Sequence, residues 1–277
     1  LEREFAAAGN RRVGCGFITW SLAKQPDLLD VVLAHRPAAL MLSFGDPRPF
    51  AARIRAAAAI LICQVQCRDH ALQALDAGAE IIVAQGTEAG GHGGTRATLP
   101  LVPALVDLVA ERAPQAMVVA AGGIADGRGL AAALALGAEG VLVGTRFYAS
   151  VESLGHATAK ARIVAATGEN TVRTTVFDTA RGYRWPDDIT GRALRNDFTL
   201  RWHGRERELA AALDGEMARY QAAAAHGDVD TAVVFTGEGA DLISDIPSAS
   251  EIVARFIAEA EIALSASAAH LVERARL

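Results

Sequence analysis

Residues 84–94 read AQGTEAGGHGG, an apolar run that passes directly into a loop with five glycines and one histidine. Glycines adopt positive φ angles easily and let a backbone approach a flat ligand closely. His92 can change its charge near neutral pH, which suits proton transfer or the binding of an anionic substrate. A flexible surface loop with an exposed histidine is the alternative interpretation.

Two more glycine segments follow apolar runs, VVAAGGIADGRG at 118–129 and VLVGTRF at 141–147. In (β/α) barrels, the loops after strands seven and eight form a phosphate cradle. Backbone N–H groups of Gly123, Gly144 and Thr145 would point at such a phosphate, helped by a helix N-terminus. One tight strand-to-helix turn is weak evidence for a phosphate site. Two such turns in consecutive βα units, after a glycine loop, favour a phosphate cradle.

Strand-like and helix-like patterns alternate through the first half of the chain. The predicted strands are 13–19, 38–44, 60–65, 80–84, 117–121 and 140–143, and the predicted helices are 26–35, 49–58, 68–77, 101–112 and 127–136. Strands that are apolar throughout are covered on both faces, as in parallel sheets. This rhythm fits an open doubly wound sheet or the last six strands of a barrel. The glycine segments favour the barrel, because barrel active sites lie just after strand carboxyl ends.

The alternation stops after about residue 150. Residues 151–203 look irregular, and the Arg and Asp cluster at 181–197 is predicted to be solvated. Residues 205–225 resemble a helix, and Ser248 to Glu251 form a capping box ahead of a last helix. We therefore predict a barrel at 1–150 and an irregular, helical appendage packed on it at 151–277.

Composition limits the classes of function. About half of the 277 residues are apolar, enough to bury a large core, and the formal net charge is −5. This balance, without a long basic run, excludes nucleic acid and anionic membranes as expected partners. No apolar run approaches a transmembrane length, and no signal peptide is visible. Three cysteines fit a reducing compartment, so we expect a cytoplasmic protein without a metal site.

Three stretches resemble the nitronate monooxygenase (2-nitropropane dioxygenase) family: QGTEAGGHGG at 85–94, AAGGIADGRGLAAALALGAEGVLVGTRF at 120–147 and GEGADLISDIPSASEIV at 237–253. The resemblance extends over nearly the whole chain. SFGDP at 43–47 is similar to the family's loop after strand four. The resemblance implies a (β/α)8 TIM barrel that binds FMN and carries an added helical segment.

The resemblance also assigns site residues. It makes His92 the catalytic base and gives no metal ligands. The residues implied to bind FMN are Gln85, Gly90 and Gly91 beside the flavin, and Gly122, Gly123, Val143, Gly144 and Thr145 at the phosphate end.

The implied reaction is the FMN-dependent oxidation of an alkyl nitronate or nitroalkane by O2 to a carbonyl compound and nitrite. One alternative is an FMN-dependent enoyl-thioester reductase or NAD(P)H:quinone reductase, whose relatives share the EAGGH-type loop. The 43–47 loop favours the oxygenase over these. A non-catalytic, degenerate barrel is a further alternative. The expected partners are a small-molecule substrate and O2, with a homo-oligomer possible.

Two features depart from the family pattern. The family begins with a strand that ends in Pro-Met and backs the flavin, followed by a second strand, and this chain shows neither. Because residues 1–8 read as the end of a helix, we expect roughly 50 further residues before Leu1, enough for two βα units. Gly16 stands where the family commonly carries an asparagine toward the flavin, which puts flavin affinity in doubt.

The remaining aromatic and imidazole side chains are interpreted as structural. Trp20, Trp185 and Trp202 are predicted to be packing anchors, although Tyr183 and Trp185 could cap the pocket. The other histidines lack the spacing of metal ligands and are predicted at surfaces or helix ends; they are His35, His70, His156, His203, His226 and His270.

Overall fold

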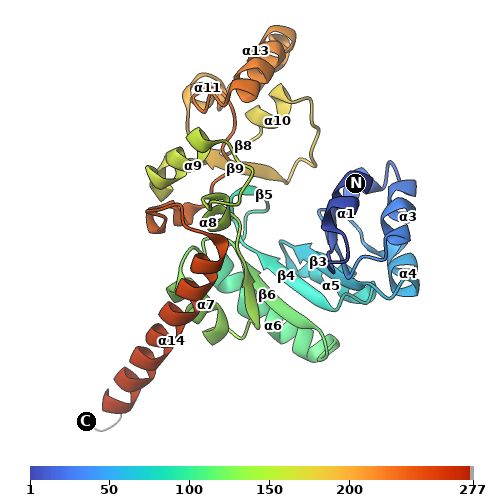
Figure 1. The fold of residues 1–277 in the computed structure, drawn as a ribbon, viewed down its shortest axis with the longest axis vertical. Coiled ribbons are helices and arrows are strands. Elements are labelled where there is room, and N and C mark those ends of the chain that lie inside the picture. The colour runs from blue at the N-terminus through green and yellow to red at the C-terminus, as the bar shows by residue number, and fades with distance from the viewer. Residues whose placement is uncertain (275–277) are drawn as a thin grey trace. The chain divides into compact units, whose positions relative to one another are not determined.

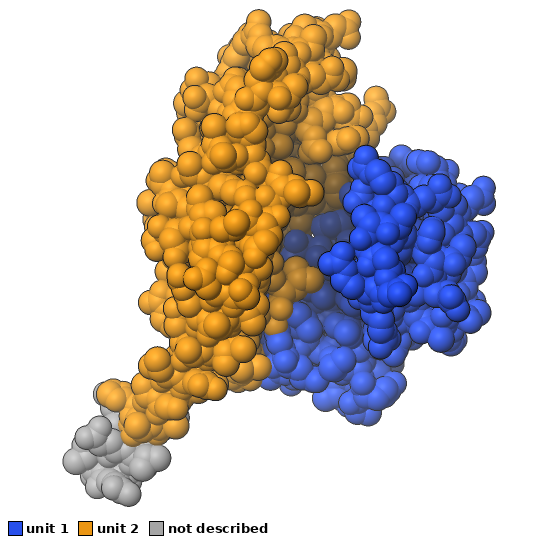
Figure 2. Space-filling model, in the orientation of Figure 1, with its two compact units in different colours: residues 1–85, 98–120, 136–140 blue, residues 86–97, 121–135, 141–277 orange. Residues whose placement is uncertain are grey.

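The computed structural model describes residues 1–274, which fall into two compact units that interleave along the chain (Figure 2). Unit 1 contains residues 1–85, 98–120 and 136–140, and unit 2 contains residues 86–97, 121–135 and the chain from 141 onward. The expected division of the chain at residue 150 stays a prediction.

A six-stranded parallel sheet carries the fold, in the order β1-β2-β3-β4-β6-β7 (Figure 1). Its strands are β1 (Cys15–Ile18), β2 (Ala39–Ser43), β3 (Ile60–Val65), β4 (Ile81–Gln85), β6 (Met117–Ala121) and β7 (Gly140–Leu142). Each strand of this sheet neighbours the next one along the chain, as in a barrel, whereas a doubly wound sheet reverses its order at a switch point. The predicted TIM-barrel class, with all six expected strands, is confirmed.

The expected helices lie between these strands. They are α3 (Asp27–Ala34), α4 (Arg48–Ala56), α5 (Arg68–Asp76), α6 (Thr98–Arg112) and α7 (Gly127–Ala135), and two shorter ones are α1 (Glu2–Ala8) and α2 (Thr19–Leu22). As expected, α1 ends at Gly9, which has a φ of 60°.

The two faces of the sheet in unit 1 differ in burial. On β2 and β3, the fully buried residues Leu40, Leu42, Leu61 and Cys63 alternate with half-buried ones. This burial raises the pKa of the Cys63 thiol to about 12. The strand register aligns two rows on the other side, Gly16–Met41–Ile62–Ile81 and Ile18–Ser43–Gln64–Val83, and burial along the second row increases from the exposed Ile18 to the fully buried Val83.

Unit 2 contains a second sheet, antiparallel and in the order β5-β9-β8. Its strands are β5 (Gly91–Gly93), β8 (Thr171–Thr174) and β9 (Thr190–Leu194). The prediction that residues 151–203 are irregular is wrong, because they hold β8, β9, α9 (Ala157–Val164), α10 (Val176–Ala180) and α11 (Asp197–Trp202). The strands TVRT and TGRAL are short and contain arginines, so they lack the apolar run that identifies a strand in sequence.

The rest of unit 2 is mostly helical. The helix expected at 205–225 is two helices, α12 (Glu206–Ala211) and α13 (Leu213–His226), which meet at Ala212. The last helix is α14 (Ala249–Arg274), and the short α8 (Thr145–Tyr148) follows β7. The capping box before α14 is confirmed, because Glu251 N–H donates to Ser248 Oγ and Ser248 N–H donates to Glu251 Oε2. Among the helices within residues 1–274, none combines the length and hydrophobicity needed to cross a bilayer.

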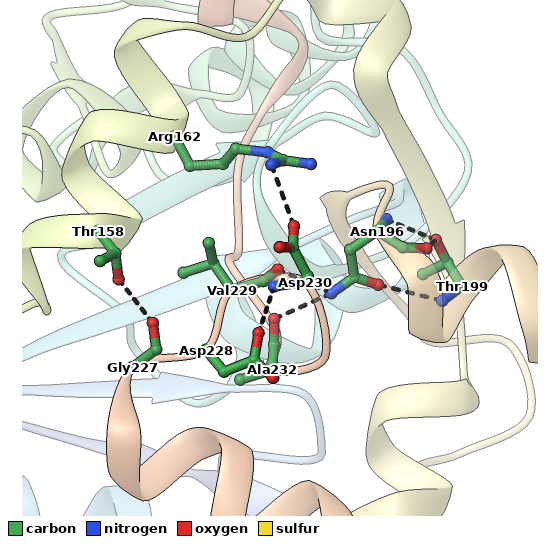
Figure 3. A network of polar contacts seen from close by, with 9 residues as sticks. All are labelled: Thr158, Arg162, Asn196, Thr199, Gly227, Asp228, Val229, Asp230 and Ala232. Carbon is green, nitrogen blue, oxygen red and sulfur yellow. Dashed lines mark hydrogen bonds and ion pairs between the residues drawn. The ribbon is translucent and has the colours of Figure 1, made fainter.

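Asn196 connects α11 to the loop after α13 (Figure 3). Its Oδ1 atom accepts a hydrogen bond from Thr199 N–H at 3.1 Å, and its Nδ2 group donates to the carbonyls of Val229 and Ala232, each at 3.1 Å. Asn196 is 5% exposed, so its loss would leave buried carbonyls without donors.

We predict that Asn196→Ala lowers the free energy of unfolding by about 2–4 kcal/mol, since it removes a helix cap and two buried hydrogen bonds. Arg162→Ala is the matched control. It breaks the exposed ion pair of Arg162 with Asp230 in the same network and should cost less than about 1 kcal/mol. Urea denaturation measures both variants, and equal losses would contradict the assignment.

Candidate active site

His92 lies on β5, where it is paired with Gly191 of β9. Its side chain is only 11% exposed, so the alternative of an exposed surface loop is wrong. A Cβ atom added at Gly191 would lie 3.1 Å from Phe235 Cε1 and 3.6 Å from His92 Nε2. The glycine on β9 therefore leaves the space that the imidazole and the Phe235 ring occupy.

Asp178, on α10, holds the imidazole from one edge. The distance from its Oδ2 atom to His92 Nε2 is 2.9 Å, and the carboxylate side chain is 6% exposed. The Asp178 Oδ1 atom lies 3.9 Å from the Arg181 Nη1 atom. A carboxylate hydrogen-bonded to one ring nitrogen holds the imidazole in one orientation. Sequence reasoning missed Asp178, because 86 positions separate it from His92 and no motif surrounds it.

Aromatic rings cover the faces of the same imidazole. Trp185 stacks on His92 with ring centroids 3.6 Å apart and planes 10° from parallel, and the Phe235 ring lies 5.4 Å away in a tilted arrangement. Trp185 is thus a packing anchor, as predicted, and it packs against His92. The stacked Trp185 ring therefore covers one face of the imidazole.

Two arginines hold the glycine loop through its carbonyl groups. Arg173 donates to the carbonyls of Thr87 at 3.0 Å and Gly93 at 2.5 Å, and Arg192 Nε also donates to Thr87 at 2.9 Å. Burial, and then the charge of Arg192, lower the pKa of Arg173 to about 10, so it stays protonated at neutral pH. Arg192 is 8% exposed, which makes the predicted solvation of the 181–197 cluster wrong at this residue.

The segment 236–239 brings several predicted site residues together. Gly237 N–H donates to Thr145 Oγ1 at 3.0 Å, and a Cβ at Gly90 would lie 2.7 Å from Gly237 N. A Cβ at Gly239 would lie 3.0 Å from the Gly123 carbonyl oxygen. Gly90 is therefore needed for a backbone-to-backbone contact within the protein.

The predicted phosphate segments combine glycines of positive φ with open space. Gly122 and Gly123 have φ angles of 108° and 73°, which favour glycine. A Cβ added at Gly144 or Gly91 would meet no atom within 4 Å. Gly144 directly precedes α8, and Val143 before it is half-buried. A side chain at Gly144 would therefore meet open space.

In unit 1, Gln85 ends β4 and is 7% exposed. Its Oε1 atom accepts hydrogen bonds from Gln64 Nε2 and Gln66 Nε2, each at 3.0 Å. Gly16 lies on β1 beside Met41, and a Cβ atom added there would lie 3.8 Å from the Met41 carbonyl oxygen, an ordinary van der Waals contact. Within residues 1–274, no cluster of three His, Cys, Asp or Glu side chains could hold a metal ion.

Comparison with known proteins identifies relatives. The profile of the nitronate monooxygenase family matches residues 18–259. A nitronate monooxygenase of Neurospora crassa is 31% identical, over 90% of this chain and 71% of its own length. A 5-hydroxy-7a-methyl-1-oxo-octahydro-1H-indene-4-carboxyl-CoA dehydrogenase of Mycobacterium tuberculosis is 29% identical, over 89% of this chain and 78% of its own. The structure of FabK from Thermotoga maritima aligns with a TM-score of 0.83 and 30% identity, covering 97% of this chain and 82% of that one.

The chain does not extend over the whole of its curated relatives. Alignments with several of them span 61% to 78% of those proteins' lengths.

We predict that Arg173→Lys loosens the glycine loop, because one ammonium group cannot reproduce the planar fork that spans the Thr87 and Gly93 carbonyls. Losing about 1–3 kcal/mol of hydrogen bonding should speed amide hydrogen exchange in residues 86–94 by roughly tenfold or more. Arg128→Lys, at a side chain that is 70% exposed, is the control and should leave exchange there unchanged. Unaltered exchange in Arg173→Lys would show that the loop keeps its shape without this residue.

Proposed function

Because the chain belongs to the nitronate monooxygenase family and is an enzyme of the flavin oxidoreductase type, we propose that it binds FMN and oxidises alkyl nitronates with O2. The products would be a carbonyl compound and nitrite. The observation that carries this proposal is the buried pair of His92, in the glycine loop, and Asp178, on α10.

His92 would act on the neutral nitroalkane. Its imidazole would take the proton from the α-carbon, which leaves the nitronate anion, and the Asp178 carboxylate would stabilise the imidazolium that forms. The stacked Trp185 ring keeps the imidazole in one plane during this transfer. The nearby charges of Arg173 and Arg192 favour the anionic product, although both guanidinium groups are already bound to the loop.

FMN, when bound, would supply the electron acceptor for the nitronate. We propose that Gly122, Gly123, Val143, Gly144 and Thr145 hold its phosphate, and that Gln85, Gly90 and Gly91 lie beside its ring. The open space next to Gly144 and the positive φ angles of Gly122 and Gly123 support the phosphate assignment. The proposed homo-oligomer and cytoplasmic location stay predictions.

A second candidate function is reduction of an enoyl thioester or a quinone with NAD(P)H. It is favoured by the relative named as an indene-4-carboxyl-CoA dehydrogenase, which aligns over 89% of this chain. Anaerobic mixing of the FMN-loaded protein with a nitronate, with NADH and with NADPH separates the two, because the true reductant bleaches the flavin. Family membership and the buried pair argue against a non-catalytic barrel.

We predict that His92→Asn and Asp178→Asn both keep bound flavin but lower kcat/KM for a neutral nitroalkane by about 10²–10⁴-fold, the usual contribution of a general base. Preformed nitronate needs no proton abstraction, so its turnover should fall much less. His35→Ala is the control, since His35 stacks on Phe5 and has no part in the proposed site. Equal losses with nitroalkane and nitronate would remove His92 from the role of base.

We predict that Gly144→Val weakens FMN binding by more than about tenfold while the melting temperature of the flavin-free protein stays the same. The protein itself has room for the new side chain, so the clash would be with the phosphate. Gly140→Val is the matched control, because Gly140, at the start of β7, also faces open space. Full flavin content in Gly144→Val would show that the cradle lies elsewhere.

A further inference from the structure

Arg181, in unit 2, lies beside the His92–Asp178 pair. The two oxygens of the Asp178 carboxylate face different groups: Oδ2 lies 2.9 Å from His92 Nε2, and Oδ1 lies 3.9 Å from Arg181 Nη1. The Phe235 ring also neighbours both groups, because its centroid lies 5.4 Å from that of the imidazole and 5.9 Å from Arg181 Cζ. The guanidinium and the imidazole therefore share one carboxylate and one aromatic neighbour.

The N–H groups of the Arg181 guanidinium are not used to hold the fold. A guanidinium has five N–H donors, and 3.9 Å is too long for a hydrogen bond to Asp178. The side chain donates a hydrogen bond to no residue between 1 and 274, and the buried Asp178 Oδ1 atom accepts none there. Arg173 and Arg192, in contrast, are bound to carbonyls of the glycine loop. Because the Arg181 side chain is 30% exposed, its donors can reach a ligand.

Two aromatic rings restrain the guanidinium in this position. Arg181 Cζ lies 4.7 Å from the centroid of the Tyr183 ring, and Phe235 is the second ring. A cation over aromatic faces is held without the use of its N–H donors. These donors form a rigid, planar fork that matches two oxygens on one planar centre. Nitro and nitronate groups have that geometry, as carboxylates do, so the Arg181 fork fits them.

The charges of this cluster also follow the proposed reaction. A neutral imidazole, the Asp178 carboxylate and the Arg181 guanidinium sum to no net charge, which suits a neutral nitroalkane. Proton transfer to His92 gives the cluster one positive charge at the moment when the substrate becomes an anion. Without Arg181, the same step would end with a cluster of no net charge beside that anion. Arg181 therefore stabilises negative charge where the reaction creates it.

We propose that Arg181 binds the two oxygens of the substrate's nitro group while His92 removes the α-proton. This inference rests on the proposed function, in which His92 is the base. The C–H bond breaks, its proton passes to the imidazole, and its electron pair moves onto the nitro oxygens, where the Arg181 N–H groups lie. Arg181 thus selects substrates that carry a planar group of two oxygens with a full or developing negative charge.

The test is steady-state kinetics of the FMN-loaded chain with preformed nitronate and with the neutral nitroalkane. Nitronate binds as an anion, so Arg181→Gln should raise its KM by about 10–100-fold, the usual effect of losing hydrogen bonds to a charged group, and leave kcat nearly unchanged. In the nitroalkane, negative charge appears only during proton transfer, so the loss should fall on kcat. A merely structural role would lower both substrates in the same way.

Two further variants control for charge and folding. Arg184→Gln removes the same charge from an exposed position three residues along the chain and should leave both substrates unchanged. Arg181→Lys keeps the charge but not the planar fork, so its KM for nitronate should rise less than in Arg181→Gln. Flavin content and melting temperature, measured for every variant, show that the chain is folded.

Nitrite, a small anion with two oxygens, tests the site without turnover. Isothermal titration of the FMN-loaded chain should show that nitrite binds about tenfold more weakly to Arg181→Gln than to wild type or Arg184→Gln. Equal affinity in wild type and Arg181→Gln, or no binding to wild type, would overturn the anion site.

The outcomes separate this inference from the proposed function. Nitronate that reduces the flavin with the same KM in wild type and Arg181→Gln would overturn the role of Arg181 and leave the proposed function in place. An equal rise of KM in Arg184→Gln would do the same, because it reports only the overall charge. A wild-type flavin that no nitro compound reduces would overturn the proposed function, and the nitrite titration then decides on Arg181 by itself.

Discussion

The glycine loop depends on hydrogen bonds that come from outside it. Five glycines in residues 86–94 leave few side chains to hold a shape, and each glycine loses much conformational freedom on folding. Arg173 and Arg192 compensate by donating to the Thr87 and Gly93 carbonyls, and β9 pairs with β5. The position of His92 follows from this restraint, since His92 is the middle residue of β5.

The same small sheet brings the chemistry together. β9 supplies Gly191, which makes space for the imidazole, and Arg192, which binds the loop. The segment between β8 and β9 supplies Asp178 and Trp185, which hold the ring by an edge and a face. The proposed conversion of a nitroalkane to its nitronate needs a proton acceptor, and a histidine restrained in this way would present one in a fixed orientation.

The barrel strands could be predicted from the sequence, whereas the contacts that restrain the glycine loop and His92 could not. The six parallel strands are apolar runs bounded by glycines and helices, so local pattern reveals them. β8 and β9 are short, contain buried arginines and pair with residues far along the chain, and no local pattern encodes such pairing. Asp178 was missed for the same reason. Gly90, which is predicted to lie beside the flavin, also packs so closely on the backbone of Gly237 that a Cβ atom would not fit there. Only the folded chain reveals that contact. His70 was expected at a surface or helix end, and it lies in the first turn of α5, where its half-buried ring also contacts Gln66.

The central claim is that a restrained His92 starts the reaction by removing a proton from carbon. The most direct measurement is the anaerobic rate of flavin reduction by a nitroalkane with deuterium or hydrogen at the α-carbon, compared with the preformed nitronate. With the nitroalkane, a primary isotope effect is expected, and this effect should depend on His92. With the preformed nitronate, no isotope effect is expected. Reduction of the flavin by NADPH but by neither nitro compound would contradict it.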